Sequence, residues 1–153
     1  MSNRNISWAA PLRELKSDRT VRSAVREERL RTSAGLRGVC FISMSAWRGS
    51  SSRRYVVVIQ PLETVDLVAD DAAVVLAVVR NAQGQASIVA ARACDAGDPG
   101  FLGWLAACAT LGARELHAYR LAGTRAERAA IAADLGGPAL SATMGGCDAP
   151  ARV

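Results

Sequence analysis

The sequence predicts an α+β fold, in which an N-terminal helical segment precedes a largely antiparallel sheet of about five strands covered by two C-terminal helices. Two observations predict it. Pairs of β-branched segments separated by short turns indicate two hairpins, and apolar residues at helical spacing follow them. With 153 residues, half of them hydrophobic, the chain is long enough to bury one core. We therefore expect a single domain over residues 1–153.

The expected strands form two hairpins and one separate strand. Residues 38–47 pair with 55–62 through the turn RGSSS, and residues 72–80 pair with 87–94 through NAQGQ. Residues 115–121 (ELHAYRL) form a short fifth strand. Its place, at an edge of the sheet or between the hairpins, stays open.

The helices are predicted from their start and stop signals. Asp98 and Pro99 begin a helix that runs to about residue 111, and Thr124 with Glu127 forms a capping box for a last helix closed by Gly136-Gly137-Pro138. Both are expected to cover one face of the sheet. The remaining boundaries are a loose N-terminus (1–10), a basic helical segment (11–34), an α+β core (38–136) and a loosely ordered tail (139–153).

Composition excludes several functional classes. The four cysteines form no CxxC pair and the chain has one histidine, so we expect no metal site; we also expect no cofactor and assign no catalytic residue. No phosphate-binding, dinucleotide-binding or nucleophile-elbow motif is present. Apolar segments are far shorter than the roughly 20 residues that cross a bilayer, and the first residues lack the apolar core of a signal peptide. The expected location is cytoplasmic, with no membrane partner.

Charge is distributed unevenly along the chain. Residues 1–54 hold twelve Arg and Lys against four Asp and Glu, a net of +8, whereas the remainder carries a net of −3. This asymmetry is the most informative feature of the sequence, because a basic segment on a slightly acidic body is typical of a protein that meets a polyanion.

Two groups of residues are candidates for that contact. On a helix, the arginines of the basic segment would form one ridge, and the tip of the first hairpin adds arginines beside three serines and two aromatic rings. A solvated helix face with ordinary i,i+4 ion pairs explains the same pattern without function. The candidate binding residues are Arg19, Arg22, Arg26, Arg29, Arg48, Arg53, Arg54, Trp47 and Tyr55.

The leading hypothesis is a small non-catalytic protein that binds nucleic acid or a nucleoprotein machine through the basic helix and the hairpin tip. Its size and lack of enzyme motifs fit a regulator or accessory protein of the type carried by phages and mobile elements. The first alternative is a protein-interaction module, either an inhibitor that meets an acidic protein surface or a subunit of a homo-oligomer.

The second alternative is a small enzyme. Strand alternation places Glu115, His117 and Tyr119 on one face, where a carboxylate beside a histidine could support acid–base chemistry together with Asp95 or Asp98. A polar strand face and a turn before a helix produce the same pattern without catalysis. The enzyme hypothesis requires a pocket at this face and a histidine with a perturbed pKa.

Overall fold

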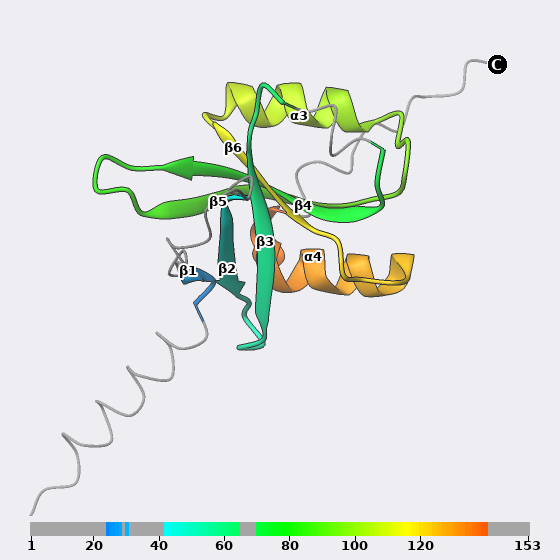
Figure 1. Ribbon diagram of the computed structural model, residues 1–153, viewed down its shortest axis with the longest axis horizontal. Helices are drawn as coiled ribbons and strands as arrows, with labels where there is room; N and C mark the ends of the chain where they lie inside the picture. The colour runs from blue at the N-terminus through cyan, green and yellow to red at the C-terminus, as the bar shows by residue number, and fades with distance from the viewer. Residues whose placement is uncertain (1–23, 29, 31–41, 65–69, 141–153) are drawn as a thin grey trace, which may run out of the picture.

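The computed structural model describes residues 24–28, 30, 42–64 and 70–140. They form a six-stranded antiparallel sheet and two helices, which confirms the α+β class (Figure 1). The strands are β1 (Arg26–Glu28), β2 (Met44–Arg48), β3 (Arg54–Pro61), β4 (Ala73–Arg80), β5 (Ala86–Cys94) and β6 (Glu115–Tyr119). The helices are α3 (Phe101–Thr110) and α4 (Arg125–Leu140).

The sheet has the order β1-β2-β3-β6-β4-β5. Both predicted hairpins are present, as β2–β3 and β4–β5, and β6 lies between them, paired with β3 on one side and β4 on the other. Leu116, His117 and Ala118 are buried because β6 has a strand on each side and a packed layer on each face. This resolves the open position of the predicted fifth strand.

β1 is a sixth strand, and it corrects the prediction of a helix over residues 11–34. Arg26–Glu28 pair antiparallel with Arg48, Trp47 and Ala46 of β2. The apolar positions of this segment are too sparse to hold an amphipathic helix against a core, whereas pairing with β2 supplies backbone hydrogen bonds. Apart from residues 24–28 and 30, the predicted helix lies outside the described residues, as do residues 1–10 and 141–153.

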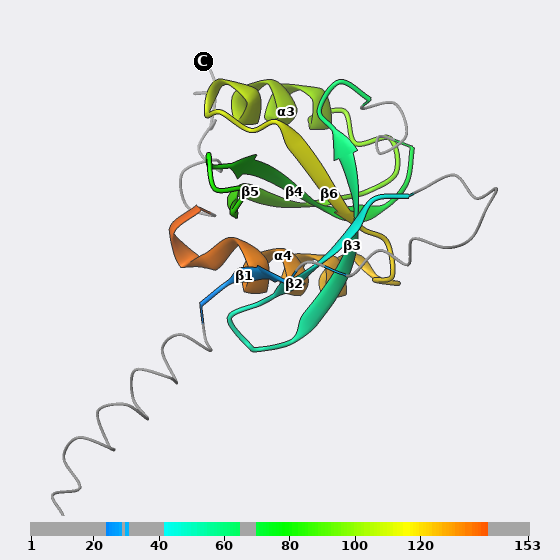
Figure 2. The same cartoon turned by 60° about the vertical axis from the view of Figure 1, so that its left-hand side comes forward.

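The two helices cover opposite faces of the sheet, not one face as expected (Figure 2). On one face, Phe101, Trp104, Leu105 and Cys108 of α3 pack against alanine and valine side chains of β4 and β5 and against Leu116. On the other, Ile131 and Leu135 of α4 pack with a cluster that includes Trp47, Tyr55 and Leu76. A sheet with apolar side chains on both faces needs both covers. None of the described helices is long and apolar enough to span a bilayer.

The sheet is curled, so its edge strands approach each other on the α4 side. In Figure 1, β3 runs across the direction of β4 and β5. Val25, just before β1, packs against the same cluster as Ile88 of β5. Together with Trp47 and Leu135 they line a cavity of about 270 Å³.

Helix boundaries differ from the predicted ones in two places. α3 begins at Phe101, because Asp98 accepts hydrogen bonds from the Gly100 amide and from Arg92 and so belongs to a turn. The Thr124 hydroxyl accepts the Glu127 amide, as predicted, while the Glu127 carboxylate accepts the Gly123 amide. α4 continues to Leu140 and is not closed at residues 136–138.

Candidate functional site

Three of the predicted arginines lie side by side on the sheet. Arg26 of β1 pairs in register with Arg48 of β2, and Arg48 pairs with Arg54 of β3. Each is next in sequence to a residue that packs on the α4 side, namely Val25, Trp47 or Tyr55. Because side chains alternate along a strand, the three arginine side chains lie on the opposite face of the sheet. We call Arg26, Arg48 and Arg54 the arginine row. Arg19, Arg22 and Arg29 lie outside the described residues.

Glu28 is the carboxylate that binds the arginine row. It accepts a hydrogen bond of 2.6 Å from Arg48 Nε, and its carboxylate also lies 3.3 Å from Arg54 Nε and 3.9 Å from Arg26. The hydrogen bond from Arg48 holds the pKa of Glu28 below its usual range. All three guanidinium groups therefore lie within ion-pair distance of the Glu28 carboxylate, and the Arg54 side chain keeps 49% of its surface exposed.

Apolar side chains continue the same face beyond the arginine row. Met44 and Val56 are 46% and 41% exposed, whereas α3 covers only the half of this face built by β4, β5 and β6. Because Met44 and Val56 lie on neighbouring strands, they extend the face on which the arginines lie. Within the described residues, the part of the sheet that α3 does not cover thus combines cationic and apolar surface.

The two predicted aromatic contacts are not part of this surface. Trp47 and Tyr55 are 1% and 3% exposed and point into the core on the α4 side. Tyr55 meets Tyr119 edge-on, with ring centroids 5.5 Å apart. This corrects the expectation that both rings are available to a ligand. The Arg53 guanidinium lies 6.0 Å from the Tyr55 centroid, and Arg53 and Arg54 are both exposed at the tip.

The hairpin tip is docked on α4. Ser50 and Ser51, two of the three serines at the predicted tip, donate their hydroxyls to the Asp134 carboxylate at 2.7 and 2.6 Å. The Ser50 amide also donates to the backbone carbonyl of Asp134 at 3.1 Å. That carbonyl would ordinarily accept the amide hydrogen of residue 138, which is proline and has none, so the hairpin supplies the missing donor. The contact therefore satisfies the one α4 carbonyl that Pro138 leaves without its usual donor.

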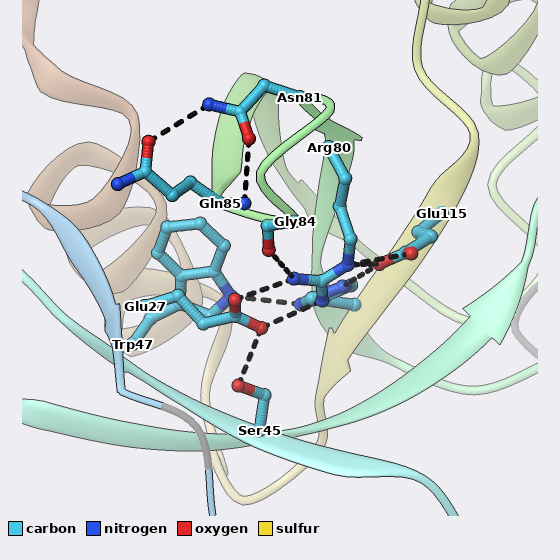
Figure 3. Close-up of polar contacts among 9 residues, drawn as sticks. Glu27, Ser45, Trp47, Arg80, Asn81, Gly84, Gln85 and Glu115 are labelled. Atoms are coloured by element: carbon cyan, nitrogen blue, oxygen red, sulfur yellow. Dashed lines mark hydrogen bonds and ion pairs between the residues drawn. The ribbon is translucent and has the colours of Figure 1, made fainter.

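A polar network lies inside the curl of the sheet (Figure 3). Arg80 at the end of β4 reaches Glu115 of β6 at 2.8 Å through Nε and Glu27 of β1 at 2.7 Å through Nη1. Glu27 also accepts the Ser45 hydroxyl at 2.8 Å. Figure 3 shows the two carboxylates on either side of the guanidinium, so the network connects strands that are not neighbours in the sheet.

The network fixes the protonation state of the only histidine. The Trp47 indole donates to His117 Nδ1 at 2.9 Å, so Nδ1 accepts and the ring proton resides on Nε2. Nε2 lies 3.0 Å from Glu115 and donates to it. Burial lowers the pKa of His117, an effect that Glu115 only partly opposes. The ring is therefore neutral, fully buried and bonded through both nitrogens.

These contacts weaken the enzyme hypothesis at its predicted residues. The pKa of His117 is perturbed as that hypothesis required, but its two nitrogens bind Trp47 and Glu115 and have no free position for a substrate. Asp95 binds Arg128 at 2.5 Å, and Asp98 binds Arg92 at 2.8 Å. Arginine pairing accounts for both aspartates without catalysis.

A small open cavity adjoins the polar network. It has a volume of about 190 Å³ and is lined by Glu27, Ser45 and Arg80 on its polar side and by Met44 and Ile59 on its apolar side. Burial raises the pKa of Glu27, but hydrogen bonds from Arg80 and Ser45 outweigh that effect and leave it lowered. Among the described residues, no three His, Cys, Asp or Glu side chains are grouped as metal ligands.

Comparison with known proteins identifies no relative of this chain. No protein-family model, curated protein or solved structure matches this chain. The functional argument therefore rests on the geometry of its own residues.

Proposed function

We propose that this protein is a non-catalytic nucleic-acid-binding protein that contacts its ligand through the outer face of β1, β2 and β3. The observation that carries the proposal is the register of Arg26, Arg48 and Arg54 on adjacent strands. Adjacent strands are about 4.8 Å apart, so three guanidinium groups are presented over a span of about 10 Å. A cationic row across three adjacent strands is suited to the phosphates of one nucleic-acid strand.

The local charge supports this assignment. Glu28 contacts all three arginines of the row, Arg53 is exposed at the adjoining tip, and the Arg48 guanidinium is held by both Glu28 and the Ser52 carbonyl. Arginine forks bind phosphate oxygens in pairs, and a fixed guanidinium loses less conformational entropy when it does so. Exposed Met44 and Val56 offer apolar contact to bases on the same face.

A single strand fits this surface better than a duplex. A two-stranded ribbon reads the major groove only if it can enter it, and the β2–β3 hairpin is flanked by β1 and β6 and docked on α4. An open sheet face instead accepts unstacked bases and their backbone. A regulator or accessory protein acting on single-stranded DNA or RNA is the functional class that follows.

The test is fluorescence anisotropy with single- and double-stranded oligonucleotides at two salt concentrations. Arg48→Gln/Arg54→Gln removes two phosphate contacts, so affinity should fall about 10- to 100-fold and the salt slope by about 1.5. The matched control is Arg114→Gln/Arg125→Gln, which changes net charge equally at exposed positions outside the row. No binding at low salt, or equal loss in the control, would overturn the proposal.

The protein-interaction alternative is favoured by one observation, the exposure of Met44 and Val56 beside the cations. An acidic protein surface, including that of a second copy, would use the same face. Mass measured in solution over a range of concentrations tests self-association. A concentration-dependent dimer that Val56→Lys dissociates, with no oligonucleotide binding, would replace the nucleic-acid assignment.

A further inference from the structure

The tip of the β2–β3 hairpin surrounds one carboxylate with donors. Asp134 Oδ1 accepts the Ser50 hydroxyl and the Ser51 amide, both at 2.7 Å. Asp134 Oδ2 accepts the Ser51 hydroxyl at 2.6 Å and the Tyr55 hydroxyl at 2.8 Å. Four donors therefore converge on two oxygens, and no basic side chain is among them.

The loop is shaped to let an anion approach its backbone. A Cβ added at Gly49 would overlap the Asp134 carboxyl group, so the carboxyl group can hold this position only because residue 49 has no side chain. Ser52 has φ of 67°, a left-handed conformation that is uncommon without glycine, and its amide donates back to the Gly49 carbonyl at 2.9 Å. The chain thus turns tightly around the carboxylate.

The donor set is one that phosphoryl oxygens also accept. A backbone amide and hydroxyls beside a glycine form the concave anion sites that bind phosphate in many proteins. Arg53 follows the loop and is exposed, which adds a positive charge beside it. The loop also ends the two strands that carry Arg48 and Arg54.

We propose that residues 49–52 and Tyr55 form an oxyanion-binding site whose resident occupant is the Asp134 carboxylate, and that a phosphoryl group exchanges with it. Because the Asp134 carboxylate is part of the same folded chain, it competes with any free anion, so the site is self-inhibited in the resting protein. Displacement of Asp134 also releases the hairpin side chains from α4. The site stands whether or not the arginine row binds nucleic acid.

The first experiment is a titration of the wild-type protein with inorganic phosphate, followed by the amide resonance of Ser51. The resonance should shift saturably with phosphate and stay fixed with sodium chloride at equal ionic strength. A Ser51 amide that does not respond to phosphate overturns the exchange.

The second experiment removes the occupant. Asp134→Ala should unfold at a temperature at least about 2 °C higher in phosphate than in chloride, because the vacated donors bind the added anion. Ser50→Ala/Ser51→Ala in the same background should lose that difference. If Asp134→Ala is unfolded in chloride, recovery of the fold in phosphate supports the site, and failure to recover contradicts it.

An oligonucleotide titration distinguishes the sources of phosphate. Binding about 5-fold tighter in Asp134→Ala than in wild type would assign the site to phosphodiesters of the bound strand. Unchanged oligonucleotide affinity together with the phosphate response would assign it to free phosphate or a phosphate monoester. If no oligonucleotide binds but the phosphate response is present, the proposed function fails and the oxyanion site remains.

Discussion

Replacement of Arg80 by methionine tests the polar network directly. Arg80 binds Glu27 through both terminal nitrogens, at 2.7 and 2.9 Å, and Glu115 through Nε at 2.8 and 3.0 Å. Methionine keeps most of the apolar length of the side chain but leaves both carboxylates without their cation. In that variant Glu27 would still accept the Ser45 hydroxyl, and Glu115 would still accept the His117 ring N–H.

The expected loss of folding free energy depends on how far the network is exposed to solvent. Removing one partner of a buried ion pair costs about 3–5 kcal/mol. The Glu27 side chain is only 7% exposed, but those of Arg80 and Glu115 are 22% and 26% exposed, so water recovers part of the loss. We expect Arg80→Met to reduce the free energy of unfolding by about 2–4 kcal/mol at pH 7.

The destabilisation caused by Arg80→Met should depend on pH. In the wild type, burial raises the pKa values of Glu27 and Glu115, and the hydrogen bonds and charge of Arg80, together with Ser45 at Glu27 and His117 at Glu115, more than offset it. These lowered pKa values stabilise the fold above about pH 4.3, and that stabilisation is lost as the pH falls through them. In Arg80→Met burial dominates and the pKa values rise above their unfolded values, so protonation favours the folded state. The cost should therefore shrink between pH 7 and pH 5.

Urea unfolding followed by circular dichroism at both pH values measures the cost. Arg125→Met is the control, because Arg125 is 83% exposed and its pairing with Asp95 should contribute less than about 0.5 kcal/mol. A loss below about 1 kcal/mol for Arg80→Met, or an equal loss at pH 5 and pH 7, would refute the reasoning.

Three further predictions use other parts of the molecule. Trp47→Phe leaves His117 Nδ1 buried without a donor, so the free energy of unfolding measured in urea should fall by about 1–3 kcal/mol. Trp104→Phe should lower it by less, because a phenyl ring can still stack on Phe101. Gly49→Ala forces a methyl group against Asp134 and should cost about 1–3 kcal/mol, whereas Gly103→Ala, with open space around it, should be neutral or stabilising; equal midpoints would argue against a tight loop. Burial raises the pKa values of the Cys94 and Cys108 thiols to about 11, so iodoacetamide at pH 8 should spare both until urea is added, as peptide mass spectrometry would report.

Local signals in the sequence predicted much of the sheet and both described helices. Residues 55–62 and 72–80 are β-branched runs next to turn residues, so their strand propensity and pairing are local properties. The Thr124 cap is local too, since it depends on residues three positions apart. The arginines at positions 48, 53 and 54 were identified from their place at the predicted hairpin tip, which locates the charge along the chain but not the face of the sheet on which it lies.

Other features depend on residues far apart in the chain. The Arg26–Glu28 segment has arginine spacings that suit a helix, but it becomes a strand because β2 offers an unpaired edge and because Glu27 meets Arg80, 53 positions away. Pro138 is read as a helix stop, yet Ser50 supplies a donor to the carbonyl that proline leaves unpaired. Neither partner is visible in a local window.

The sequence by itself determined the fold class, the two hairpins and the concentration of positive charge in the first third of the chain. Only the tertiary structure decided that Trp47 and Tyr55 face the core, that the helices lie on opposite faces, and that His117 is bonded through both nitrogens. The physical reason is that turn chemistry and secondary-structure propensity depend on a few neighbouring residues. Burial and hydrogen bonding depend instead on side chains that are distant in sequence and that only the tertiary fold brings into contact.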